Sequence, residues 1–101
     1  LDIGGETEWT LYILSHLCHE IGDASEGHLF MKKYLKQWPN NPEVLSLMWN
    51  AEIELGKRKD AIETLKRLKN LTPYNEEITA TLQKLMMEEE LAGNFWDTNT
   101  K

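Results

Sequence analysis

The sequence predicts an all-α fold of five helices joined by short connections. Two kinds of helix-ending residue recur at one interval: Gly22 and Gly56 are 34 positions apart, and so are Pro39 and Pro73. Between these residues, apolar side chains recur at steps of three and four, which places them on one face of a helix. No alternation of apolar and polar residues, the pattern of a half-buried strand, is sustained along the chain. The common interval indicates a repeated pair of helices.

The first predicted pair of helices lies between residues 7 and 39. The first helix begins near Thr7 and ends before Gly22, which suits the left-handed position after a helix because glycine has no Cβ. Asp23 or Ser25 caps the second helix, and Pro39 ends it. The two apolar stripes are Leu11, Leu14, Leu17, Cys18 and Ile21, then Leu29, Phe30, Met31, Tyr34, Leu35 and Trp38.

The second predicted pair lies between residues 41 and 73. Asn41 supplies a capping side chain, Pro42 suits the first helical position, and Glu43 places a carboxylate at the positive end of the helix dipole. This third helix runs to Leu55, and the fourth opens at Lys59 or Asp60. The expected buried faces are Leu45, Leu47, Met48, Ala51 and Leu55, then Ala61, Ile62, Leu65, Leu68 and Leu71.

A fifth helix is predicted from about Asn75, since Glu76 and Glu77 supply an acidic first turn. Its apolar residues are Ile78, Leu82, Leu85, Met86 and Leu91. We expect a flexible segment at residues 1–7 and a frayed tail at residues 93–101.

Helix pairs of this length, with a glycine after the first helix and a proline after the second, resemble tetratricopeptide repeats. The two repeats are residues 8–41 and 42–75. The small residue that opens the second helix in the family falls on Gly27 and Ala61, and both closing prolines match. The chain departs from the family at Trp49, where a small residue is usual, and at Tyr34, where alanine is usual.

The resemblance implies a right-handed α-solenoid with residues 76–92 as its C-terminal capping helix. Two repeats and a cap make a short array, since each repeat buries its apolar face only against its neighbours. The chain begins at Leu1 without an initiator methionine, which we take as a hint of a longer protein. We therefore expect stacking on further repeats or self-association.

The resemblance also implies that the first helices of the repeats line a concave groove that binds a partner peptide or helix. The residues expected to bind the partner are Trp9, Tyr12, His16, His19, Asn50, Ile53, Glu54 and Lys84, and the other groove-facing positions are Glu20, Glu43, Ser46, Glu77 and Ala80. The acidic edge favours a basic or amphipathic partner through complementary potential. For Trp9, two readings stay open: an anchor for the partner, or packing on a preceding repeat or on the N-terminal segment.

Composition limits the other functions. The chain has 101 residues with a net charge of −6, which disfavours phosphate binding as its main role. Nine of the 11 basic residues nevertheless lie in the second helices and one turn, so a basic convex face stays a weaker nucleic-acid alternative. They are Lys32, Lys33, Lys36, Lys57, Arg58, Lys59, Lys66, Arg67 and Lys69.

No catalytic, cofactor or metal site is predicted. His16, His19 and Glu20 are residue types that bind zinc, but Cys18 lies on the apolar stripe and no other cysteine can complete a set of four ligands. Cys18 has no activating base on its own face, so we expect a buried, inert thiol. The sequence contains no glycine-rich phosphate loop and no nucleophile motif.

The favoured function is a non-catalytic adaptor that binds a protein or peptide, with no small-molecule substrate. The alternative is a regulatory or docking segment of a larger enzyme or complex whose active site lies outside these residues. The single cysteine fits a reducing compartment, and no apolar run is long enough to span a bilayer. The sequence therefore predicts a soluble cytoplasmic protein.

Overall fold

The described part of the chain is all-α, which confirms the predicted class. The computed structural model describes the backbone of residues 7–99 and the side chains of residues 7–92, and contains helices and turns but no strand in this range. The five helices are α1 (Glu8–Ile21), α2 (Ala24–Gln37), α3 (Pro42–Glu54), α4 (Arg58–Leu71) and α5 (Glu76–Asn99). The predicted flexible segment at residues 1–7 lies outside the described residues except for Thr7.

Local capping chemistry sets most of the helix ends. Thr7 Oγ1 accepts a hydrogen bond from the backbone N–H of Thr10, and Asp23 caps α2 by accepting from the backbone N–H of Glu26. Asn41 caps α3. Gly22 and Gly56 follow α1 and α3 with φ of 79° and 77°, the left-handed region that glycine adopts without strain.

The structure differs from the prediction at two helix ends. The fourth helix begins at Arg58, before the predicted start at Lys59 or Asp60. Lys57 occupies the N-cap position and makes no side-chain capping hydrogen bond. The fifth helix continues to Asn99, whereas we predicted its end at residue 92. Residues 93–99 contain no proline, and one glycine costs a helix only about 1 kcal/mol.

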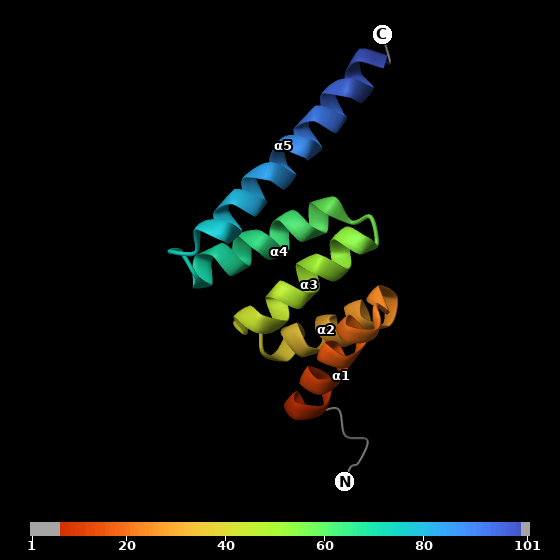
Figure 1. Cartoon of the computed structure of the whole chain (residues 1–101), viewed down its shortest axis with the longest axis vertical. Coiled ribbons are helices and arrows are strands. Elements are labelled where there is room, and N and C mark those ends of the chain that lie inside the picture. The colour runs from red at the N-terminus through yellow and green to blue at the C-terminus, as the bar shows by residue number, and fades with distance from the viewer. Residues whose placement is uncertain (1–6, 100–101) are drawn as a thin grey trace.

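Each helix packs against the next one along the chain. Figure 1 shows α1 and α2 at one end of the molecule and α5 at the other. Within residues 7–99, the only further pair of helices in contact is α1 with α3, so these two helices lie side by side although α2 separates them in sequence. Among the described helices, α5 packs against α4 alone.

The helix starts preserve the interval seen in the sequence. The helices α1, α3 and α5 begin at residues 8, 42 and 76, and α2 and α4 begin at residues 24 and 58. Each start is thus 34 positions after the equivalent one before it.

One core cluster runs through all five helices. Its apolar members are Leu11, Met31, Tyr34, Leu35, Val44, Leu45, Leu47, Met48, Ala51, Ala61, Ile62, Leu65, Leu68, Leu82 and Leu85. Trp49, the departure from the tetratricopeptide pattern, packs partly buried against this cluster. The bulky side chain is therefore accommodated at the border of the core.

The predicted core face of α1 was partly wrong. Leu11 and Cys18 are buried, but Leu17 and Ile21 are exposed, and so is Leu29 of α2. The buried face of α1 instead includes Ser15, whose hydroxyl donates to the backbone carbonyl of Leu11 at 2.8 Å. This hydrogen bond satisfies the hydroxyl, so the polar side chain of Ser15 can be buried in the helix interface.

At Gly27 the helices α1 and α2 approach each other closely. A Cβ added there would lie 3.0 Å from Cys18 Cβ and 3.3 Å from Met31 Cε. The methionine terminus can move, but Cys18 Cβ is fixed to the α1 backbone. The prediction that this position must be small is therefore matched by the geometry of the helix pair.

We expect Gly27→Val to lower the free energy of unfolding by about 1–3 kcal/mol, because the added atoms force the two helices apart. Urea unfolding followed by circular dichroism measures the change. Ser25→Val, at an exposed position of the same helix, is the matched control. Equal losses in both variants would show that valine itself, rather than the close approach, is responsible.

Candidate partner-binding surface

Three predicted groove residues form an aromatic row along α1. The rings of Trp9 and Tyr12 are stacked with centroids 5.9 Å apart, and His16 meets Tyr12 edge-on at 4.6 Å. Trp9 is 68% exposed, so most of its indole remains in contact with solvent although it lies on Tyr12.

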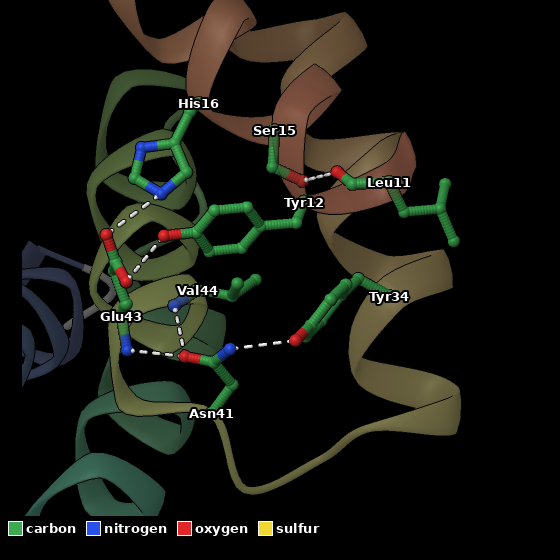
Figure 2. Close-up of polar contacts among 8 residues, drawn as sticks. All are labelled: Leu11, Tyr12, Ser15, His16, Tyr34, Asn41, Glu43 and Val44. Carbon is green, nitrogen blue, oxygen red and sulfur yellow. Dashed lines mark hydrogen bonds and ion pairs between the residues drawn. The ribbon is translucent and has the colours of Figure 1, made fainter. Parts of the chain in front are cut away.

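Glu43, in the first turn of α3, contacts two members of this row across the interface between α1 and α3. Tyr12 Oη donates to Glu43 Oε1 at 2.8 Å, and His16 Nε2 lies 3.1 Å from Glu43 Oε2 (Figure 2). Of these two contacts only the one with Tyr12 has hydrogen-bond geometry, since His16 Nε2 is buried without a hydrogen-bond partner among the described residues. This pairing fixes the two first helices against each other at the surface.

A second layer lies beneath the row and was missed by the sequence analysis. Tyr34 of α2 is buried, and its hydroxyl donates to Glu8 Oε2 at 3.0 Å and accepts from Asn41 Nδ2 at 2.7 Å. Figure 2 shows Asn41 also capping α3, so one amide serves both the tyrosine and the helix. The only sequence signal was the unusual tyrosine at a position where the resemblance implies alanine.

These residues surround two adjoining pockets. The first has a volume of about 290 Å³ and is lined by Glu8, Trp9, Tyr12, Tyr34 and Asn41. The second, of about 540 Å³, shares Glu8, Tyr34 and Asn41 with the first. Its remaining walls are Gln37, Trp38, Pro39, Asn40 and Pro42. Aromatic faces and carboxylate oxygens thus meet at one place on the surface, beside the start of α1 and α3.

Neither a protein-family model nor a curated protein matches the chain.

The other predicted groove residues do not join this surface. His19 and Glu54 line a small cleft at the ends of α1 and α3. The side chain of Asn50 donates to the backbone carbonyl of Ser46 on its own helix, at 2.8 Å. Ile53 faces a pocket of about 660 Å³ that Leu85 of α5 also lines. Lys84 is exposed on α5, which does not reach α1.

Both tyrosines have pKa values above the usual value for a phenol. For Tyr12 the largest cause is the bond to Glu43, because ionising the phenol would place a negative charge beside a carboxylate. For Tyr34 the largest cause is burial, which raises the pKa; the hydrogen bond from Asn41 lowers it, and the bond to Glu8 raises it again. Both phenols are thus held in the neutral form that can donate to a carboxylate.

We expect stability to fall as the pH rises above about 10, the unperturbed tyrosine pKa. The unfolded chain loses these phenolic protons first, so in this range it binds fewer protons than the folded chain and is favoured. Urea midpoints measured at about pH 8 and about pH 11 test this. The double variant Tyr12→Phe plus Tyr34→Phe should lose less stability over the interval than the wild type, and an equal loss would contradict the assignment.

Cys18 and the neighbouring histidines show no arrangement for metal binding. Burial is the largest cause that raises the pKa of the Cys18 thiol, which disfavours the thiolate that binds metals. Within the described side chains, no group of three His, Cys, Asp or Glu residues is placed to hold a metal ion.

Several of the basic residues are already paired within the chain. Arg58 and Lys59 lie 3.3 and 3.8 Å from Glu89, and Lys66 lies 3.5 Å from Glu63. Arg67 donates to the backbone carbonyl of Pro39 at 3.0 Å.

None of the helices within the described range has the length and apolar character needed to cross a bilayer.

Proposed function

We propose that the chain is a non-catalytic, cytoplasmic adaptor that binds a partner peptide or helix on the surface formed by α1 and α3. The observation that carries the proposal is the aromatic row of α1, which bonds to α3 through Glu43. Trp9 of this row is exposed, and Trp9 and Tyr12 line the first of the two adjoining pockets. Exposed aromatic residues beside a pocket are typical of the energetically important part of a protein interface.

The proposed architecture is a right-handed α-solenoid of two tetratricopeptide-like repeats, residues 8–41 and 42–75, closed by α5. Two features support it: the constant 34-residue spacing of the helix starts, and the contact of α1 with α3 across α2. In a solenoid of helix pairs, the first helices lie next to each other and form one continuous surface. The α1–α3 contact is the arrangement that such a surface requires.

An affinity pull-down with the folded chain tests the proposed function. The test variant is Tyr12→Ala plus Glu43→Ala, one substitution on each of the two helices. The control variant is Lys69→Ala plus Asn70→Ala, two exposed residues of α4. We expect the wild type and the control to retain partners that the test variant loses.

Circular dichroism and thermal unfolding must first show that both variants are folded, since Tyr12 bonds to Glu43. If the folded test variant retains every partner, the α1–α3 surface does not bind them and the proposal is wrong.

A further inference from the structure

The pocket between Trp9 and Glu8 combines two features that recognise cations. Its walls are the aromatic rings of Trp9, Tyr12 and Tyr34, and its polar rim contains the carboxylate of Glu8. Glu43 adds a second carboxylate at the far side of Tyr12. Aromatic faces attract cations through the ring quadrupole, and a carboxylate next to them adds a direct ion pair.

The charges around the pocket are unbalanced in favour of a cation. None of the described residues that line the two adjoining pockets is lysine or arginine. Arg67 approaches the neighbouring loop, but its guanidinium donates to the backbone carbonyl of Pro39. His16 pairs with Glu43 from the side of α1. The carboxylate of Glu8 has Tyr34, a neutral donor, as its described partner.

The arrangement disfavours an anion, although the N-termini of α1 and α3 both lie near the pocket. Helix N-termini bind anions through free backbone N–H groups. Here Thr7 accepts from the N–H of Thr10, and Asn41 accepts from the N–H groups of Glu43 and Val44. Asn41 thus occupies the first donors of α3 and Thr7 occupies one donor of α1, and the carboxylates of Glu8 and Glu43 repel a second negative charge.

We propose that this pocket binds the guanidinium group of an arginine in the partner peptide. The proposal rests on the proposed function and adds the chemical class of ligand. A guanidinium is planar, so it stacks on the exposed indole of Trp9 while its N–H fork donates to the carboxylate of Glu8. Because the second pocket shares Glu8, a peptide can continue from this site along Trp38 and Pro39.

The direct test uses a short fluorescent alanine-rich peptide with one central arginine, titrated into the folded chain and followed by fluorescence anisotropy. Two matched peptides carry lysine or citrulline in its place, since citrulline keeps the planar shape without the charge. We expect the arginine peptide to bind most tightly, lysine more weakly, and citrulline at least about tenfold more weakly than arginine.

Two variants assign the binding to the pocket. Glu8→Gln keeps an acceptor for the hydroxyl of Tyr34 but removes the charge, and we expect it to weaken the arginine peptide about tenfold. Trp9→Ala should weaken it several-fold through loss of the stacking face. Glu90→Gln removes an exposed carboxylate of α5, which in the described structure does not contact α1, and is the matched control, with an expected change of less than about twofold.

Three outcomes overturn the arginine pocket: no saturable binding of the arginine peptide, equal binding of the citrulline peptide, or equal losses in Glu8→Gln and Glu90→Gln. The pull-down distinguishes failure of the arginine-pocket proposal from failure of the proposed adaptor function. If folded Glu8→Gln and Trp9→Ala retain every partner that Tyr12→Ala plus Glu43→Ala loses, the α1–α3 surface binds partners but the arginine pocket is wrong. If all of these variants retain every partner, both proposals are wrong.

Discussion

Replacing Glu52 with alanine is expected to lower the free energy of unfolding by about 3–5 kcal/mol. Glu52 lies on α3 and is only 3% exposed. Its Oε2 is 3.4 Å from His28 Nε2 of α2, and its Oε1 accepts a hydrogen bond from Thr64 Oγ1 of α4 at 2.8 Å. Removing the carboxylate leaves two buried polar side chains without this partner and opens a cavity, and both effects are unfavourable.

Urea unfolding followed by circular dichroism measures the effect of Glu52→Ala. The matched control is Glu54→Ala, because Glu54 lies on the same helix but is exposed. A small domain has about 5–15 kcal/mol of stability in total, so the buried substitution should remove a large part of it and the control very little. A difference of less than about 1 kcal/mol between the two variants would show that the polar cluster does not stabilise the fold.

The cluster of His28, Glu52 and Thr64 could not be predicted from the sequence. Glu52 and Glu54 look equivalent there, since both follow Ala51 in a charged stretch of one helix. Their environments differ because α2 and α4 cover only one side of α3. Which carboxylate is buried therefore depends on partners contributed by two other helices, and no local pattern contains that information.

The helix ends were predictable where one side chain or one glycine determines them. Asp23, Asn41, Gly22 and Gly56 act within a few residues of their own positions, so capping rules suffice. The start of α4 was misplaced because no side-chain cap marks it. Local chemistry thus predicts an end only where the sequence supplies the capping group.

The candidate site was also predictable only in part. Tyr12 and His16 were expected on one surface from their shared helix, with Glu43 at a neighbouring position, and the structure joins all three. Glu8 and Tyr34 were missed because their contact spans two helices. The expected continuation of the groove to Lys84 assumed that α5 follows α3, whereas α5 packs only on α4 within the described structure.

A matched pair of leucines on α1 tests why the predicted core face was partly wrong. Leu11 is fully buried and Leu17 is 53% exposed, although both lay on the predicted apolar stripe. We expect Leu11→Ala to cost about 2–5 kcal/mol, because it removes a core side chain and leaves a cavity. Leu17→Ala should change stability by less than about 1 kcal/mol, since little buried area is lost. Urea unfolding of both variants at low protein concentration gives the comparison.

The result for Leu17 also decides whether the outer face of α1 is covered in solution. Trp9, Ile13, Leu17 and Ile21 lie four positions apart and are all exposed, so they form one apolar stripe on that face. A helical period predicts that these side chains share a face, but which neighbour covers the face depends on packing. If Leu17→Ala costs as much as Leu11→Ala, and the cost rises with protein concentration, then another copy of the chain buries the stripe. A small cost at all concentrations means that the stripe is in contact with solvent, as the structure places it.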